Sequence, residues 1–358
     1  MTAELPALWS EVCTFYYAAH APNTRVQYDA HLRYFAYFCV ATGYDFERPS
    51  QYEVMMYSAL LARTLAPQSV KQYLKGLKDH YKQRGYSDFA DGKQWPQLYA
   101  MLKGIARVKK VGITKKLPIS PAMLVRFGTG LKRDARGTAL WACVLITFFG
   151  YFRKSNTTTE GTSPFGAGKC LRVCDITIDV KKHALRLDVQ ESKTRQFGTG
   201  KATWVAGFHG HPLDPVAAWS AHMARNRLDP ACHAFSFQSA GKVSPMRHNA
   251  LVTAAKDMAT LVGFDPAQVA GHSFRRGGAT FAFQGGVPDV LIQRQGDWLS
   301  LCYREYITVS VDQALAATHM MFTAMSDTSR PHLWGAAMVP SEDPAGHAGE
   351  SAAELFRM

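Results

Sequence analysis

Arg153, His272, Arg275 and a downstream tyrosine have residue types and spacing that could bind and attack a phosphate. His272 and Arg275 lie three residues apart at the predicted start of a helix, so both side chains can project toward one ligand. A helix N-terminus with these residues is a phosphate site in principle. Arg153 follows an apolar run, residues 139–149, that predicts a buried helix. Each signal alone is weak, because a solvent-facing pair or an arginine that satisfies helix C-terminal carbonyls explains it equally well.

A lysine and two tyrosines extend this group. Lys193 lies in a Ser-Lys-Thr sequence that connects two predicted strands, and other basic residues nearby compete with it: Lys181, Lys182, Arg195 and Lys201. Tyr303 and Tyr306 are three residues apart, so on one helix they would share a face and either could point inward. Trp298, in a Gly-Asp-Trp sequence, precedes both tyrosines.

Residues 1–108 predict a first domain, and their apolar pattern is helical throughout. Apolar residues recur at spacings of three and four after Thr24, after a helix N-cap at Ser50 and again from Ser69, and residues 94–106 predict a fourth helix. We therefore expect a small helical bundle. Residues 109–118 follow as a basic linker.

Residues 119–325 predict a second, larger domain that combines helices with a small sheet. Residues 121–129 and 139–149 are helical, and between residues 169 and 205 the period changes to two, which predicts a three-stranded antiparallel sheet. Helices resume in the second half of the domain at residues 215–226, 244–262, 273–284, 287–296 and from 301 onward. The expected class is mostly α with a small antiparallel sheet. Residues 326–358 lack a sustained apolar period and are expected to be disordered.

The composition favours an intracellular protein with a polyanionic partner. The 358 residues carry a formal net charge of +13. No apolar run approaches the roughly 18 residues of a membrane span, and Glu4 and Glu11 stand where a signal peptide would be basic and then apolar. The seven scattered cysteines are expected to be reduced. Cys170 with Cys174, or His209 with His211, could suggest a metal, but neither pair has further ligands at metal spacing, so no metal site is predicted.

The ordered set of motifs resembles the tyrosine recombinases of the phage integrase superfamily. The resemblance covers roughly residues 8–325, and the Gly-Gly-Ala-Thr-Phe-Ala and Gln-Gly-Asp-Trp sequences look closest to the eukaryotic mobile-element branch, the DIRS-type and Crypton recombinases. It implies a SAM-like helical core-binding domain followed by a tyrosine recombinase catalytic domain. The likeness also implies a nuclear location if the source is eukaryotic, and a cytoplasmic one otherwise.

The resemblance implies a role for each residue of the group. Arg153 and Arg275 would grip the nonbridging oxygens of the scissile phosphate, Lys193 would be the general acid, and His272 the motif histidine. Trp298 stands where the family has His or Trp, and Tyr306 would be the nucleophile. Asn156 departs from the family, which usually has an acidic residue three positions after the first arginine. The orientation of Arg153 is therefore an open question, although an amide oxygen can still accept a hydrogen bond.

Elementary chemistry supports these roles. Guanidinium groups suit the charge that builds on phosphate oxygens during displacement. A phenol has a reference pKa of about 10 and needs neighbouring cations or a base to react near neutral pH. The leaving 5′ hydroxyl needs a proton, which a lysine can deliver. Because a covalent link conserves the bond energy, neither ATP nor a metal is required, and we expect no cofactor.

Double-stranded DNA is the expected partner. The candidate phosphate contacts lie at the end of the first domain, in the linker and in one later helix: Arg107, Lys109, Lys110, Lys115, Lys116 and Arg276. A solvated loop explains any single lysine as well. An apolar stripe after Tyr306 predicts a further helix, which could pack in its own subunit. The resemblance implies instead that this helix docks on a neighbouring protomer, which would give a dimer on a site and a tetramer in synapsis. The alternatives are a catalytically silent DNA-binding relative and a type IB topoisomerase.

Overall fold

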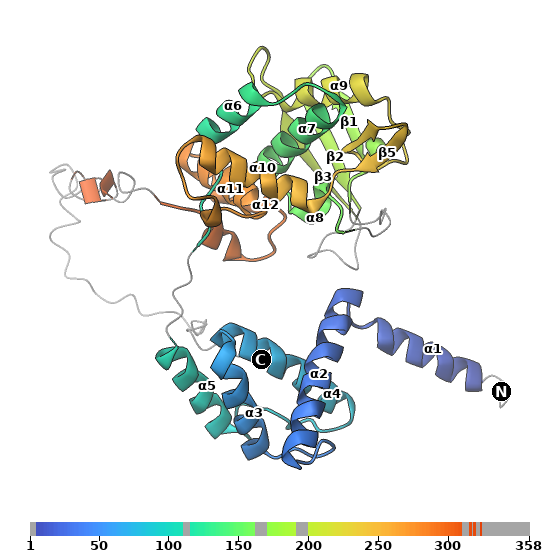
Figure 1. Ribbon diagram of the computed structural model, residues 1–358, viewed down its shortest axis with the longest axis vertical. Coiled ribbons are helices and arrows are strands. Elements are labelled where there is room, and N and C mark those ends of the chain that lie inside the picture. Colours follow the sequence, from blue (N-terminus) through green and yellow to red (C-terminus); the bar gives the residue numbers. More distant parts are fainter. Residues whose placement is uncertain are drawn as a thin grey trace, which may run out of the picture. The chain divides into compact units, whose positions relative to one another are not determined.

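The computed structural model describes residues 5–109, 115–161, 170–190 and 200–309, together with positions 315, 316, 318, 319 and 323. The chain divides into two compact units between residues 113 and 114. Figure 1 shows both units. The predicted tail, residues 326–358, and most of the predicted docking helix lie outside the described residues.

The first unit contains helices α1 Leu5–Ala18, α2 Pro22–Thr42, α3 Gln51–Thr64, α4 Pro67–Gln83 and α5 Pro96–Val108. The last four are the helices that the apolar spacing predicts. Ser50 caps α3 in a reciprocal pair: its side chain accepts from the Glu53 amide, and its own amide donates to the Glu53 carboxylate. The core of the unit consists of side chains from α2 to α5, centred on Phe35, Tyr57, Leu74 and Tyr81. Helix α1 contributes nothing to that core.

The second unit begins with α6 Pro121–Gly130, α7 Ala135–Phe149 and the short α8 Lys154–Thr157. Helix α7 is buried along most of its length, as its apolar sequence predicts. A 3-10 turn, Val173–Asp175, leads into the strands β1 Ile176–Asp179, β2 Ala184–Val189 and β3 Lys201–Ala206. They form an antiparallel sheet in the order β1-β2-β3, with Ile178 opposite Leu185 and Leu185 opposite Val205. The predicted three-stranded sheet is confirmed, although its first strand begins at Ile176 instead of near residue 171.

The rest of the second unit is α9 Pro215–Asn226, β4 Ser236–Ser239, β5 Lys242–Pro245, α10 His248–Leu261, α11 Ser273–Gln284 and α12 Asp289–Gln295, with 3-10 turns at Pro266–Gln268 and Leu301–Tyr306. Two expectations are wrong. The helix expected from residue 244 starts at His248, because residues 242–245 pair with β4 as a hairpin. The segment from Leu301 is a 3-10 turn that gives way to extended backbone at Ile307. The overall class, mostly helical with a small antiparallel sheet, is confirmed.

Two glycines allow α11 to pack closely in the second unit. A Cβ on Gly277 would lie 2.2 Å from the Ile119 carbonyl oxygen, and one on Gly278 would lie 2.2 Å from the Phe148 carbonyl oxygen. Backbone atoms cannot move aside as a flexible side chain can, so only glycine permits this approach. The Gly-Gly sequence after Arg275 therefore sets how near α11 lies to the end of α7.

Among the described helices, none has both the length and the hydropathy needed to cross a membrane.

Candidate active site

Arg275 is the most deeply buried charged side chain of the candidate site. Only 2% of its surface is exposed. One terminal nitrogen donates to the Tyr151 carbonyl and the other donates to the Gly296 carbonyl at 2.6 Å. The guanidinium carbon lies 3.8 Å from the centroid of the Trp298 ring. Two backbone carbonyls and an aromatic face thus fix the plane of the guanidinium, and none of these partners carries a negative charge.

Burial leaves the charge of Arg275 incompletely compensated. Its Nε atom is buried and has no hydrogen-bond partner among the described residues. Burial and then the neighbouring charge of Arg153 lower the pKa of Arg275 to about 9, so the group is still a cation at neutral pH. A buried cation of this kind is stabilised by an anion that enters the site.

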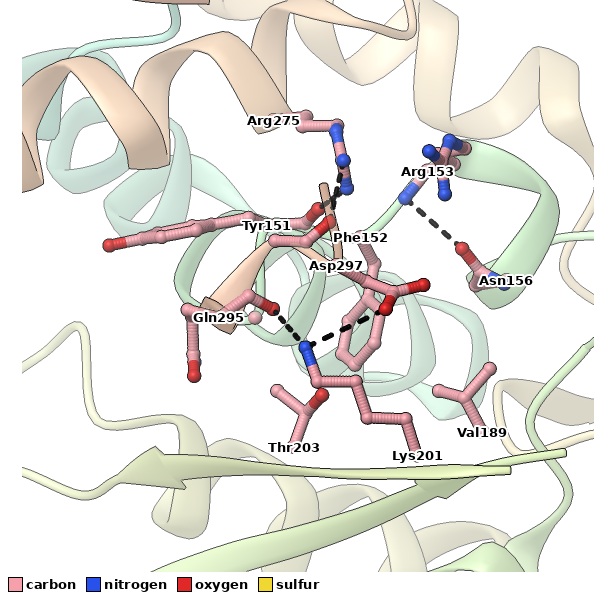
Figure 2. A pocket seen from close by; sticks show the side chains of 12 residues that line it. Tyr151, Phe152, Arg153, Asn156, Val189, Lys201, Thr203, Arg275, Gln295 and Asp297 are labelled. Carbon is pink, nitrogen blue, oxygen red and sulfur yellow. Dashed lines mark hydrogen bonds and ion pairs between the residues drawn. The ribbon is translucent and has the colours of Figure 1, made fainter. Parts of the chain in front are cut away.

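One pocket is lined by both Arg275 and Arg153, together with Asp297. In Figure 2 the two arginines lie on one side of this pocket, and Lys201 reaches in from β3 on the opposite side. The electrostatic effect of Arg153 on Arg275 also places the two charges near each other. Residues 122 positions apart in the sequence are thereby brought to one pocket.

Arg153 is half-buried at the N-terminus of α8, where Asn156 organises the backbone. The Asn156 side-chain oxygen accepts a hydrogen bond from the Arg153 amide at 3.3 Å, and Asn156 itself is buried. The Asn156 amide therefore holds the main chain of Arg153. This contact fixes where the arginine side chain starts.

His272 precedes α11 at its N-cap position and is exposed, whereas Arg275, three residues later, is buried. The surrounding protein, and then the charges of Arg275, Lys154 and Arg153, lower the pKa of His272 below its ordinary value of 6.5. The imidazole is therefore neutral at neutral pH and can accept or pass on a proton. His272 does not line the pocket shared by the two arginines, but it lies within their electrostatic reach.

The two candidate tyrosines, Tyr303 and Tyr306, have different environments. Tyr303 is 1% exposed, and its hydroxyl donates to the Asp289 carboxylate at 2.7 Å. Tyr306 is half-buried, and its ring centroid lies 5.6 Å from the guanidinium carbon of Arg275. Tyr303 is therefore a core residue with its hydroxyl occupied, while Tyr306 lies beside the arginine.

Helix α11 also holds the backbone of Tyr306. The Thr280 hydroxyl donates to the Tyr306 carbonyl at 3.1 Å, and Arg276 donates to the same carbonyl at 3.4 Å and to that of Glu305 at 3.0 Å. The guanidinium carbon of Arg276 lies 5.7 Å from the Tyr306 ring centroid. Arg276, which the sequence suggests as a DNA contact, thus contacts the tyrosine segment in this structure.

Lys201 and Gln295 tie the Gly-Asp-Trp turn to β3. Lys201 donates to the carbonyls of Arg294 and Gln295 and lies 4.0 Å from the Asp297 carboxylate. The Gln295 amide donates to the Trp204 carbonyl in β3 at 2.9 Å and to the Phe149 carbonyl at 3.2 Å. These contacts, drawn in part in Figure 2, anchor the turn whose Gly296 and Trp298 hold Arg275.

The remaining predicted residues are placed only in part. Lys193 and Lys110 lie outside the described residues. Arg107, Lys115 and Lys116 are exposed, and three of the linker lysines have partners in their own unit. Lys109 donates to the Arg63 carbonyl, Lys115 pairs with Glu305 at 3.1 Å, and Lys116 donates to the Ala267 carbonyl. Within the described part of the chain, no group of three or more His, Cys, Asp or Glu side chains is placed to hold a metal ion.

Three features of the site had no signal in the sequence. Tyr151 offers its carbonyl to Arg275 from a backbone with φ of +50°, and Asp297 has φ of +54°. Lys201 is one of several lysines that the sequence leaves as competitors, and its contacts with α12 cannot be read from its spacing. A contact between segments about 90 to 125 residues apart produces no periodic pattern in the sequence.

The fold defines the class of structure to which the chain is similar: it is the fold of the tyrosine recombinases. The Tn1549 transposon integrase, in complex with transposon right end DNA, matches with a TM-score of 0.59 and 11% identity, over 86% of this chain and 96% of that one. The XerH site-specific recombinase, bound to a palindromic difH substrate, matches with a TM-score of 0.53 and 13% identity, over 81% of this chain and 76% of that one. No protein-family model and no curated protein matches the sequence.

Proposed function

We propose that this chain is a site-specific DNA recombinase or integrase that cleaves and rejoins DNA strands through a 3′-phosphotyrosyl bond at Tyr306. The observation that carries the proposal is the buried Arg275, which shares a pocket with Arg153 and lies beside the ring of the half-buried Tyr306. A pocket with two guanidinium groups, in which the hydrogen-bond partners of the buried one are backbone carbonyls, suits a phosphodiester.

In the proposed reaction, the Tyr306 oxygen attacks the phosphorus, and the bond between phosphorus and the 5′ oxygen breaks. Arg153 and Arg275 hold the nonbridging oxygens, and each such contact is typically worth about 3 kcal/mol in the transition state. His272, neutral near pH 7, takes or orients the phenol proton, and Lys193 protonates the leaving 5′ hydroxyl. A 5′ hydroxyl from another strand then reverses the step and releases Tyr306.

Trp298 has a supporting role in this proposal. Its ring lies against Arg275 and has a centroid 5.4 Å from that of Tyr306, so it packs against both groups. Its position in the sequence is the one that the resemblance assigns to a His or Trp.

The partner in this proposal is double-stranded DNA, and the biological setting is a mobile element. Arg107, Lys109, Lys110, Lys115 and Lys116 would follow the phosphate backbone, and the helix after Tyr306 would dock on a neighbouring protomer. A nuclear location follows if the source is eukaryotic. The Tn1549 integrase is in complex with transposon right end DNA and XerH is bound to its difH substrate, which supports the choice of partner for this chain.

Trapping of a covalent adduct tests the proposal. A bound sequence is first selected from a random duplex library, and a nick is then placed near the cleavage site so that the short 5′-hydroxyl fragment diffuses away. The wild-type chain should form an adduct that resists denaturation, and Tyr306→Phe should abolish it. Tyr303→Phe is the matched control and should retain the adduct, because its hydroxyl bonds to Asp289.

The same assay separates the alternatives. A chain that selects a sequence but forms no adduct is a silent DNA-binding relative. A chain that relaxes supercoiled DNA without any selected sequence is a type IB topoisomerase. An adduct that persists in Tyr306→Phe and disappears in Tyr303→Phe would reassign the nucleophile.

A further inference from the structure

The Thr280 hydroxyl lies between α11 and the segment that carries Tyr306. Thr280 is 1% exposed. Its hydroxyl donates to the Tyr306 carbonyl at 3.1 Å and accepts a hydrogen bond from the Thr308 amide at 3.2 Å. A hydroxyl has one hydrogen to donate and two lone pairs that accept, so one oxygen can bind both groups at once. The two partners lie on either side of Ile307.

These two hydrogen bonds span the point where the backbone changes conformation. The 3-10 turn Leu301–Tyr306 ends there, and Ile307 has extended backbone, with φ of −75° and ψ of 132°. A hydroxyl that binds the last carbonyl of the turn and the first amide beyond Ile307 fixes both the end of the turn and the direction in which the chain leaves it. The position of the Tyr306 backbone depends on these two bonds.

Tyr303 holds the same turn on its other side. Its hydroxyl donates to the Asp289 carboxylate of α12 at 2.7 Å. Tyr306 therefore lies between two fixed contacts, one with α12 and one with α11, and its ring centroid is 5.6 Å from the guanidinium carbon of Arg275. Thr280 limits how far the Tyr306 backbone can move away from Arg275.

Arg276 shares the Tyr306 carbonyl with Thr280, but its contact is the weaker one. Arg276 lies one helical turn before Thr280, is half-buried, and donates to this carbonyl at 3.4 Å. Water can compete for a guanidinium that solvent reaches, whereas a hydrogen bond in the buried interior is electrostatically stronger. Gly277 and Gly278 also pack α11 directly against neighbouring backbone, so the Thr280 hydroxyl has a fixed place from which to bind.

We propose that Thr280 is a positioning residue for Tyr306: its buried hydroxyl fixes the backbone on both sides of Ile307 and so keeps the phenol beside Arg275. The inference rests on the proposed function, because it takes Tyr306 as the nucleophile. Valine has nearly the shape of threonine but no hydroxyl, so Thr280→Val removes this partner from the Tyr306 carbonyl and the Thr308 amide, while Thr280→Ser keeps it. Placement of the reacting groups controls the rate, since a shift of about 1 Å can slow a reaction by about 100-fold.

Single-turnover kinetics of the full chain on the nicked substrate test this role. At saturating DNA, Thr280→Val should form the adduct about tenfold more slowly or worse, with unchanged affinity for DNA, because the phosphate-binding cations are untouched. Thr280→Ser should recover most of the rate. Thr138→Val is the matched control: Thr138 is 7% exposed, and its hydroxyl donates to the Asp134 carbonyl near the start of α7, whereas Arg153 follows the end of that helix. This control should lower the stability, measured by chemical denaturation, and leave the rate unchanged.

Hydrogen exchange of the Thr308 amide tests the contact without any catalysis. Exchange at Thr308 should be faster in Thr280→Val and near the wild-type rate in Thr280→Ser, and the Gly207 amide, which donates to the His183 carbonyl at 2.7 Å, is the internal reference. A normal cleavage rate in Thr280→Val, equal slowing in Thr138→Val, no recovery in Thr280→Ser, or unchanged exchange at Thr308 would each overturn the proposal. A wild type that forms no adduct would overturn the proposed function, whereas the exchange rate at Thr308 decides the Thr280 contact in either case.

Discussion

The environment of Arg275 shows how single residues define the candidate site. A buried guanidinium usually pairs with a carboxylate, but here its partners are two carbonyls and the Trp298 ring. The Asp297 carboxylate lines the same pocket but lies 4.0 Å from the Lys201 ammonium, and among the described residues it makes no hydrogen bond to Arg275. The neutral partners orient the cation and leave its charge available to an incoming anion.

The environment of His272 predicts how the rate of adduct formation depends on pH. Its pKa lies below 6.5, first through the surrounding protein and then through Arg275 and Lys154. If the neutral imidazole is the active form, adduct formation stays constant as pH falls through 6.5 and declines only below it. Lys154→Met removes one of the cations, so the pKa of His272 should rise and the acid limb should move to higher pH.

The measurement is the initial rate of adduct formation between about pH 5 and 8. His272→Gln should lose the acid limb, because an amide does not titrate. A limb that remains at the same pH in both variants would assign the titration to another group.

At the scale of elements, α11 organises the site. It carries Arg275, its Thr280 and Arg276 hold the backbone of Tyr306, and its two glycines set its distance from α7. One helix thereby positions both the candidate phosphate-binding arginine and the candidate nucleophile.

Gly277→Ala tests this close packing. The added Cβ would meet the Ile119 carbonyl oxygen at 2.2 Å, so α11 must shift, and we expect a loss of about 2–3 kcal/mol in the free energy of unfolding. Chemical denaturation measures this value. Gly104→Ala in α5 is the matched control, since a Cβ there meets nothing within 4 Å, and it should be neutral or slightly stabilising.

Lys201 tests how β3 is coupled to the Gly-Asp-Trp turn. Lys201→Met removes the contacts to the α12 carbonyls and to Asp297, so the turn that holds Arg275 should loosen and cleavage should slow by about tenfold or more. Lys182→Met, an exposed lysine at the β1–β2 turn, is the control and should cleave normally.

A substrate with sulfur in place of the leaving 5′ oxygen separates positioning from proton donation. A thiolate leaves without a proton near neutral pH far more readily than an alkoxide. This substrate should restore cleavage in Lys193→Met, the candidate general acid, but not in Lys201→Met. Full rescue of Lys201→Met would instead make Lys201 the general acid.

At the scale of the whole molecule, positive charge is the property that bears on DNA binding. The net charge of +13 attracts a polyanion, and release of counterions makes such binding dependent on salt. The sequence predicts that Arg107 and the linker lysines contact DNA phosphates.

Arg107→Ala tests that claim. If Arg107 contacts one phosphate, the slope of log affinity against log salt should decrease by about one, and binding should weaken similarly for every DNA sequence. Lys242→Ala, an exposed lysine in β5, should leave the slope unchanged. Binding measured by fluorescence anisotropy from about 50 to 200 mM salt gives both slopes. Equal slopes for wild type and Arg107→Ala would remove Arg107 from the interface.

Much of the secondary structure could be predicted from the sequence, because its signals are local. Ser50 starts its helix as the N-cap that its residue type predicts, and alternation in the sequence predicts the three-stranded sheet. Local signals failed where pairing overrode them: the β4–β5 hairpin shortened the helix expected from residue 244. The candidate catalytic residues and their order along the chain could also be identified from the sequence.

Tertiary structure alone decided which of those groups meet and how. Tyr303 and Tyr306 are equivalent by helical spacing, and only packing buried the first and left the second beside Arg275. The carbonyls that orient Arg275 come from residues 151 and 296, and the Lys201 contacts join β3 to α12. Side-chain periodicity reports which face of one element is apolar, but it carries no information about which distant backbone atoms that face will meet.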